Sequence, residues 1–256
     1  FPRAKSNLYD HGARLPLAIA WGQHIKGGRR VSDFVSLPDL APTFLECAGL
    51  PIPPAMSKKS LLPILSATGE GRIEPERDHI IMGKELHAWC HPEGEINPVR
   101  AIRTDAYLYI QNLKPELWPA GHPDPQHAWD LHPYGDVDQG PSKTAVLEGK
   151  DTEAGRFFFE LAFGKRPAEE LYYLPEDPYQ LHNLAFKPGY QEIKKALQSQ
   201  MLRYLEATGD PRTLGRPAVF DQAPYFWSHG LITAGLPLRE WEQLPPDRQA
   251  AKVDSM

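Results

Sequence analysis

Apolar residues follow two different periodicities along the chain. The segment "PLAIAWG", residues 16–22, is a continuous apolar run that ends at a glycine, which predicts a buried strand of the kind found in parallel sheets. The segment "VSLPDLAPTFLECAGL" has helical spacing, with Pro38 in its first turn and Gly49 after its end. Its expected buried face consists of Leu40, Phe44, Leu45 and Ala48. A strand, a loop and then a helix form part of an α/β layer.

The middle of the chain predicts several short strands followed by one long helix. One strand is expected at about residues 79–85, and "VRAIR" and "AYLYIQN" predict two more around a tight turn at Thr104 and Asp105. The segment "EELYYLPEDPYQLHNLA" adds a fourth strand and a turn. The helix is expected over residues 189–208, with the apolar stripe Ile193, Leu197, Met201, Leu202 and Leu205. Grouped strands followed by a helix indicate a small antiparallel α+β subdomain.

Two stretches have weaker patterns. Residues 115–168 are rich in Pro, Gly, His and Asp and are interpreted as a long insertion, and residues 211–256 as a C-terminal extension. A weakly patterned segment of this length inside a domain is often a functional loop.

Composition narrows the functional classes. The net charge of −5 and pI near 6.1 argue against a nucleic-acid-binding protein, which would normally have a basic face. The 256 residues contain no apolar run of about 18 residues, so no membrane span is expected. Cys47 and Cys90 form no Cys-rich zinc motif, and the sequence leaves open whether they form a bridge.

Four groups of residues have chemistry that the sequence alone does not decide. Arg3 and Lys5 could hold an oxyanion, or could belong to a solvated loop. His87 and His91 flank Cys90, but a zinc site needs more ligands than these. The His and Asp residues of the insertion could bind a metal ion, or reflect loop polarity. Trp118 and Trp129 could line a sugar site or pack in a core.

Several segments, in the same order along the chain, together resemble the sulfatase family. "FPRAKSNLYDHGARLPL" resembles the stretch that follows the metal-binding turn in the branch that includes heparan N-sulfatase and related bacterial sulfatases. "SLPDLAPTFLECAGL", "VRAIRTDAYLYIQN" and "KRPAEELYYLPEDPYQLHNLA" resemble a helix, a hairpin and a turn of the same family. "GDVDQGPSK" adds to the resemblance. The matches run from residue 1 to about residue 210.

The resemblance implies a fold and a chemistry. The fold would be α/β: the C-terminal part of an alkaline-phosphatase-like core, residues 1–78, and a smaller antiparallel α+β subdomain with a C-terminal helix, residues 79–210. The family hydrolyses sulfate esters or sulfamates. It uses a formylglycine nucleophile made in a "C/S-x-P-x-R" motif and a calcium ion held by three Asp and an Asn or His-type partner. A sulfated sugar would be the substrate, and the protein would be periplasmic or secreted.

The nucleophile motif is absent from the sequence. Cys47 is followed by "AGLP" and Cys90 by "HPEG", and the family's paired Asp is also missing. The sequence is therefore expected to represent the C-terminal half of a sulfatase, with the nucleophile and calcium ligands in a missing N-terminal half. Such a fragment is expected to be inactive alone.

The family pattern assigns roles to Lys5, Glu85 and His87, and the charge of Arg3 beside Lys5 adds a fourth candidate. Lys5 falls where the family has a basic residue that contacts sulfate, and Arg3 lies beside it as a second binding group. His87 and Glu85 match an "E-R-H" stretch near the substrate pocket, with His87 as a catalytic residue and Glu85 as a substrate-binding one. The open alternatives are a phosphodiesterase or phosphonate hydrolase of the same superfamily and a non-catalytic sugar-binding fragment.

Overall fold

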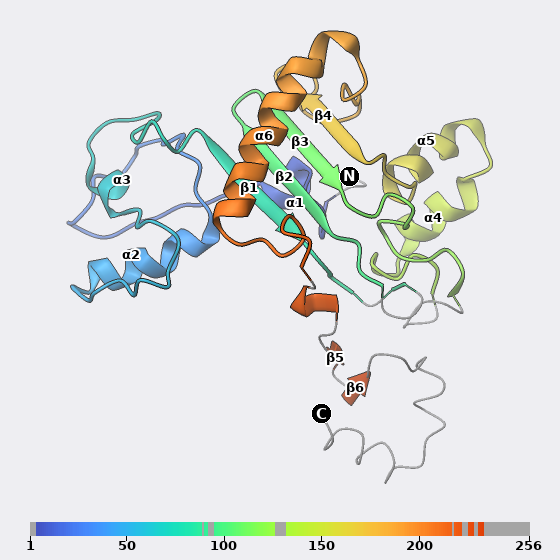
Figure 1. Ribbon diagram of the computed structural model, residues 1–256, viewed down its shortest axis with the longest axis horizontal. Coiled ribbons are helices and arrows are strands. Elements are labelled where there is room, and N and C mark those ends of the chain that lie inside the picture. Colours follow the sequence, from blue (N-terminus) through green and yellow to red (C-terminus); the bar gives the residue numbers. More distant parts are fainter. Residues whose placement is uncertain are drawn as a thin grey trace.

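A four-stranded antiparallel sheet lies at the centre of the computed structural model, which describes residues 4–88, 90–91, 95–125, 132–216, 218–221 and the backbone of 225–227 and 230–232. The strands follow chain order, β1–β2–β3–β4 (Figure 1). Their bounds are β1 His79–Lys84, β2 Val99–Thr104, β3 Tyr107–Asn112 and β4 Glu169–Tyr173. All four strands that the sequence predicts in this region are confirmed.

The β2–β3 hairpin shows why the sequence prediction succeeds here. Ile102 pairs with Tyr109 across it, and such aromatic and β-branched pairs stabilise antiparallel strands. At the turn, the Tyr107 amide donates to Thr104 Oγ1 at 3.0 Å. The local turn and the strand residues therefore predict the same structure.

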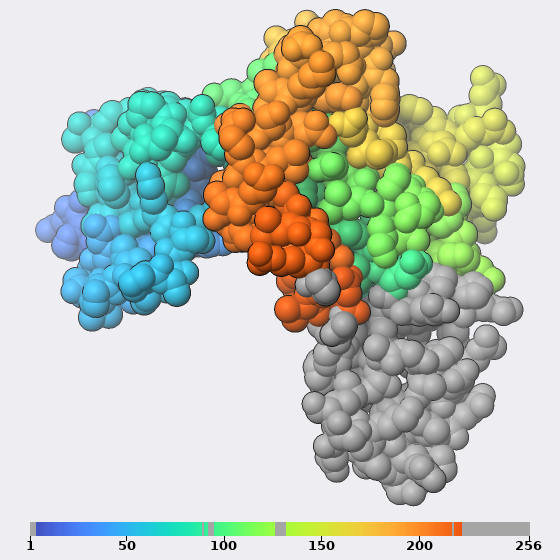
Figure 2. All heavy atoms as spheres, in the orientation of Figure 1, coloured from blue at the N-terminus to red at the C-terminus, as the bar shows by residue number. Residues whose placement is uncertain are grey.

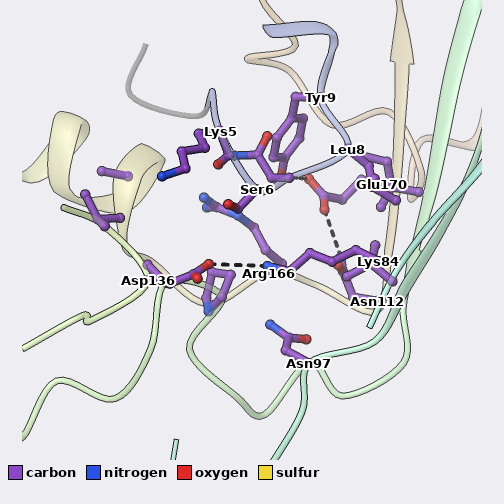
Figure 3. Close-up of a pocket in the computed structure, with 17 residues that line it drawn as sticks. Lys5, Ser6, Leu8, Tyr9, Lys84, Asn97, Asn112, Asp136, Arg166 and Glu170 are labelled. Carbon is purple, nitrogen blue, oxygen red and sulfur yellow. Dashed lines mark hydrogen bonds and ion pairs between the residues drawn. The ribbon is translucent and has the colours of Figure 1, made fainter. Parts of the chain in front are cut away.

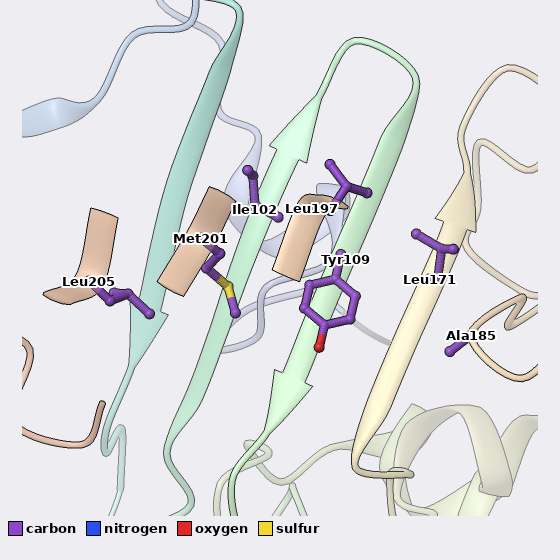
Figure 4. Packing of buried hydrophobic residues seen from close by; sticks show 7 residues of the cluster. All are labelled: Ile102, Tyr109, Leu171, Ala185, Leu197, Met201 and Leu205. Carbon is purple, nitrogen blue, oxygen red and sulfur yellow. The ribbon is translucent and has the colours of Figure 1, made fainter. Parts of the chain in front are cut away.

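One face of the sheet packs against helix α6, Gln191–Ala207 (Figure 4). Side chains alternate between the faces of a strand, so only every second strand residue contacts the helix. This core contains Ile102, Tyr109 and Leu171 from the sheet, Ala185, and Leu197, Met201 and Leu205 from α6. The helix prediction is confirmed. Of its expected apolar stripe, Leu197, Met201 and Leu205 are buried in this core, Ile193 packs against it, and Leu202 is half-buried and not part of it.

The opposite face of the sheet is covered by the N-terminal segment. Tyr9 is 5% exposed and packs with Ala101, Leu108, Ile110, Tyr172 and Leu174. The Tyr9 and Tyr172 rings meet edge to face, with centroids 6.1 Å apart. The segment that contains Lys5 is thus fixed against the sheet and continues into the short helix α1, Asp10–Ala13.

Residues 15–76 form a lobe beside the sheet (Figure 2), and two predictions made for it are wrong. Residues 16–22 form no strand and are mostly exposed. Helix α2, Leu40–Cys47, exists, but Phe44 is 67% exposed while Pro42 and Thr43 are buried. The reason is polar anchoring, because Thr43 Oγ1 accepts from the Leu61 amide at 2.8 Å and so turns this side of the helix inward.

The insertion at residues 115–168 is more regular than its pattern indicates. It contains α4, Pro141–Gly149, and α5, Glu153–Ala162. These helices enclose a third core around Ala120, Tyr134 and Phe163, against which Trp118 packs. Trp118 is therefore a packing residue, whereas Trp129 lies outside the described residues. The Pro and Gly content of the insertion hides the apolar periodicity of its short helices.

The remaining elements are short. They are η1 Leu37–Asp39, α3 Leu62–Ser66, η4 Pro188–Tyr190, η5 Val219–Asp221 and the paired strands β5 Tyr225–Trp227 and β6 Gly230–Ile232. Among the described residues, no helix has the length and apolar character needed to cross a membrane. The chain is thus a mixed α/β structure with an antiparallel sheet and a C-terminal helix, as predicted. The proposed division into residues 1–78, 79–210 and 211–256 stays a prediction.

Candidate functional site

A pocket of about 70 Å³ lies where the N-terminal segment crosses the sheet on the face opposite α6 (Figure 3). It is lined by residues that are far apart in the sequence. The charged members are Lys5, Lys84, Asp136, Arg166 and Glu170, and the amides are Asn7, Asn97 and Asn112. A smaller cleft adjoins it and shares Lys84, Asn97, Pro119 and Asp136 with it.

A buried carboxylate fixes the N-terminal segment at this pocket. Glu170 is 2% exposed, and its Oε2 accepts from the hydroxyls of Tyr9 at 2.6 Å and Tyr172 at 2.5 Å. Its Oε1 accepts from Asn112 Nδ2 at 2.8 Å. A buried charge with three donors is well compensated, and hydrogen bonds to charged groups are among the stronger ones. Tyr9 is therefore locked in place four residues after Lys5.

The Asp-His-Gly turn that follows Tyr9 forms helix α1 and holds the loop before it. The amides of Gly12 and Ala13 donate to Tyr9 O at 2.8 and 2.9 Å. Asp10 accepts from Arg103 Nη2 at 3.0 Å, which ties α1 to strand β2. A Cβ atom at Gly12 would lie 2.1 Å from Ala4 O, so only glycine permits this close approach. The turn is thus a structural support for the residue that precedes it.

Lys5 lies at the rim of the pocket. Its Nζ is 3.4 Å from Asp138 Oδ2, and both side chains are largely exposed, at 68% and 87%. An exposed ion pair of this kind contributes little to stability, which leaves Lys5 available to a ligand. The next residue, Ser6, has a φ of +66°, a strained conformation for a residue other than glycine. In the described part of the structure, Ser6 Oγ and Asn7 Oδ1 are buried and have no hydrogen-bond partner.

At the other side of the pocket, the Asp136 carboxylate contacts both Lys84 and His87. It is only 7% exposed, and its Oδ2 is 3.4 Å from Lys84 Nζ. Its Oδ1 is 2.6 Å from His87 Nδ1. If this nitrogen carries the proton, His87 donates to Asp136 and keeps Nε2 for another partner. The sequence reasoning named His87 as a catalytic residue, whereas it named Asp136, 49 residues away in the insertion, only among the possible metal ligands and missed its contact with His87.

Glu85 is held in an ion-pair network behind His87. Its Oε1 accepts from Arg100 Nη2 at 2.5 Å, and its Oε2 accepts from Arg212 Nη2 at 2.8 Å. Its side chain is 11% exposed. These contacts fix the chain just before His87, while the predicted role of Glu85 in substrate binding stays a prediction. Arg3, the other predicted binding residue, lies outside the described residues.

Arg166 is a pocket residue that the sequence reasoning missed. It follows α5, and its Nη1 and Nη2 donate to the carbonyls of Glu160 at 2.9 Å and Leu161 at 2.6 Å. Its guanidinium lies 5.8 Å from the centre of the Tyr9 ring, which is a cation–π distance. In the sequence, only the position of Arg166 shortly before the "E-L-Y-Y-L" strand could have indicated that it lines the pocket, because the pattern of apolar residues does not identify it.

His91 lines the adjoining cleft and is buried, at 6% exposed. Burial, which penalises the charged form, lowers its pKa to about 4. At neutral pH His91 is therefore uncharged, and the charge of the two clefts is carried by the lysines, Arg166 and the carboxylates.

The described residues do not provide a metal or nucleophile site. They contain no group of three or more His, Cys, Asp or Glu side chains arranged to hold a metal ion. Cys47 and Cys90 are not joined by a disulfide, and neither lies in a "C/S-x-P-x-R" motif. The described part of the chain therefore does not fit a formylglycine or a calcium ion.

The chain is similar to known sulfatases. Residues 4–126 match the family model "N-sulphoglucosamine sulphohydrolase, C-terminal". An ulvan-active sulfatase of Formosa agariphila is 30% identical over 209 residues, which cover 80% of this chain and 36% of that protein. The human N-sulphoglucosamine sulphohydrolase is 25% identical over 232 residues, or 87% of this chain and 42% of the relative.

Among solved structures, one of a protein in complex with D-glucosamine-2-N,6-O-disulfate, described as its substrate, is 20% identical. It covers 73% of this chain and 27% of its own, with a TM-score of 0.45. The chain spans about a third of the length of the first two curated relatives that it matches.

Proposed function

We propose that this chain belongs to the sulfatase family and that it forms the sulfate-binding wall of an enzyme that hydrolyses sulfate esters or sulfamates of sugars. The observation that carries the proposal is the position of Lys5 at the rim of a charged pocket, within the segment that matches the family model. The Lys5 loop is fixed by Glu170 and Gly12 at the rim of a pocket that also holds Lys84 and Arg166.

Lys5 would bind the sulfate group. In sulfate ester hydrolysis a nucleophile attacks sulfur, the S–O bond to the sugar breaks, and negative charge develops on the oxygens. An ammonium group fixed near these oxygens stabilises the charge more in the transition state than in the ground state. The exposed, weakly paired Nζ of Lys5 has both the charge and the freedom to make this contact.

His87 would act on the leaving oxygen. Its Nδ1 faces Asp136, so the ring is oriented and Nε2 can deliver a proton to the sugar oxygen as the S–O bond breaks. This assignment balances the charge of the leaving group, which departs as a neutral alcohol. The nucleophile would come from a part of the whole protein outside this sequence, because neither cysteine here has the required motif.

The test is steady-state kinetics of the whole protein with aryl sulfates. We expect Lys5→Ala to lower kcat/KM by at least about 10²-fold, a barrier increase of about 3 kcal/mol. His87→Gln should slow substrates with poor leaving groups more than those with good ones, because only the former need the proton. Lys195→Ala is the matched control, since Lys195 is 66% exposed on α6.

Two results would contradict the proposal. An active whole protein in which Lys5→Ala stays near the wild-type kcat/KM would remove the role of Lys5. Hydrolysis of a phosphonate monoester but not of an aryl sulfate would assign the protein to another reaction of the same superfamily.

A further inference from the structure

The pocket contains a cation besides Lys5 that could bind an anionic group. Its lining has three cations, Lys5, Lys84 and Arg166, and two carboxylates, Asp136 and Glu170. Lys5 and Lys84 each face a carboxylate at 3.4 Å, Asp138 and Asp136 respectively, so Arg166 is the lining cation that has no ion pair among the described residues. A cation without an ion-pair partner inside a pocket attracts an anionic ligand.

The two carboxylates are already occupied by other partners. Glu170 accepts three hydrogen bonds, from Tyr9, Tyr172 and Asn112. Asp136 faces Lys84 and His87. Within the described part of the chain, neither carboxylate forms an ion pair with Arg166, so its charge is not matched by a neighbouring acid.

Arg166 is held so that part of its hydrogen-bonding capacity remains. The two contacts to the Glu160 and Leu161 carbonyls use two of the five N–H groups of a guanidinium. These carbonyls and the Tyr9 ring also fix the plane of the group. A guanidinium held rigidly, with free N–H groups, suits bidentate binding of a carboxylate or sulfate.

Arg166 and Lys5 occupy different parts of the pocket. In Figure 3 the guanidinium of Arg166 points toward Ser6, inside the space that Lys5 borders. The volume of about 70 Å³ compares with about 10–15 Å³ for a single water, so the interior has room for about five waters. This suits one oxyanion group but not a sugar ring, which would stay at the open rim beside Lys5.

We propose that Arg166 binds a second anionic group, a carboxylate or a second sulfate, on the sugar residue whose scissile sulfate contacts Lys5. The inference rests on the proposed function, because it takes Lys5 as the contact of the reacting sulfate. It defines the substrate as a sugar with two anionic substituents, and it makes Arg166 a specificity-determining residue. The buried hydroxyl of Ser6, which has no partner in the described structure, lies beside this subsite.

The experiment is isothermal titration calorimetry on this chain at 150 mM salt. The probes are N-acetylglucosamine 6-sulfate, with one anionic group, N-sulfoglucosamine 6-sulfate, with two sulfates, and a monosulfated glucuronic acid, with a sulfate and a carboxylate. The wild-type chain should bind at least one of the doubly anionic sugars at least about tenfold more tightly than the singly anionic one. Whichever of the two doubly anionic sugars binds more tightly shows whether Arg166 prefers a sulfate or a carboxylate as the second anionic group.

Arg166→Gln should reduce this ratio to near one, and Arg166→Lys should retain part of it, because it keeps the charge without the planar fork. Lys195→Gln, an exposed cation on α6, should keep the wild-type ratio. Thermal unfolding checks that each variant is folded, and the comparison of ligands on the wild-type chain needs no variant.

Two results would overturn the proposal while leaving the proposed function intact. They are equal affinity of the wild-type chain for all three sugars, and an Arg166→Gln variant with an unchanged ratio. If the folded chain binds none of the sugars, both this inference and the assignment of Lys5 as a sulfate contact fail.

Discussion

Gly12 offers the sharpest test of how the sequence positions Lys5. Replacing it with alanine adds one methyl group at the point where α1 meets the preceding loop. That Cβ would lie 2.1 Å from Ala4 O and 2.4 Å from Asn7 O. Both atoms belong to the backbone, so no side-chain rotation can relieve the overlap, and the loop that includes Lys5 has to move.

The size of the effect follows from these distances. Real Cβ contacts lie beyond 3.0 Å, so the backbone next to Lys5 must shift by roughly 1 Å. Overpacking of this kind costs about 1–3 kcal/mol, which corresponds to a Tm lower by about 2–12 °C in a protein of this size. A catalytic group displaced by about 1 Å loses on the order of 10²-fold in rate. We therefore expect Gly12→Ala to lose nearly as much activity as Lys5→Ala.

The assay combines aryl sulfate kinetics of the whole protein with thermal unfolding. Gly27→Ala is the matched control, because no atom lies within 4 Å of a Cβ built at Gly27. We expect this control to keep the wild-type kcat/KM and Tm. Wild-type kinetics in Gly12→Ala would refute the reasoning, because it would show that the loop accommodates the methyl group without moving Lys5.

Two further predictions concern buried groups near the pocket. Tyr9→Phe removes one of the three donors to the Glu170 carboxylate, which should cost about 1–3 kcal/mol. Thermal unfolding would measure this loss, and an unchanged Tm would show that the contact does not anchor the loop. His91 has its pKa lowered by burial to about 4, so the folded chain stays unprotonated there while the unfolded chain takes up a proton below pH 6.5. The free energy of unfolding of the wild type should therefore be highest above pH 6.5 and should fall as the pH is lowered to 4. This fall should be about 3 kcal/mol larger in the wild type than in His91→Gln, and urea unfolding at each pH would measure it. Parallel pH profiles of the two proteins would contradict this.

Elements whose structure is determined by their own residues could be predicted from the sequence. In the β2–β3 hairpin, strand-forming residues flank a turn that Thr104 closes by itself, so no distant residue is needed. Helix α6 has an apolar stripe long enough to define both its type and its buried face. In these elements, the local pattern and the tertiary contact agree.

Burial of short apolar runs could not be predicted, because a pattern identifies a face but not the surface that covers it. Residues 16–22 are apolar and yet mostly exposed in the described structure. Phe44 likewise lies outward, because the hydrogen bond between Thr43 and Leu61 and the ion pair of Asp39 with Arg77 turn α2 the other way. Polar contacts between segments determine the orientation of α2, and the spacing of apolar residues gives no information about such contacts.

The candidate site depends on such long-range polar contacts even more than the fold does. Lys5 can be recognised locally, because its motif is contiguous. Its position is determined by Glu170, which is 161 residues beyond the Tyr9 that it binds. The adjacent residue Glu169 points to the other face of β4, where it pairs with Lys194 of α6 at 2.7 Å. Two neighbouring glutamates thus serve opposite faces of one strand, one supporting the helix and the other the site. The strict alternation of a β-strand makes this division necessary, and a shift of β4 by one residue would exchange the two roles. The register of β4 against β3 therefore couples the core of the sheet to the placement of Lys5.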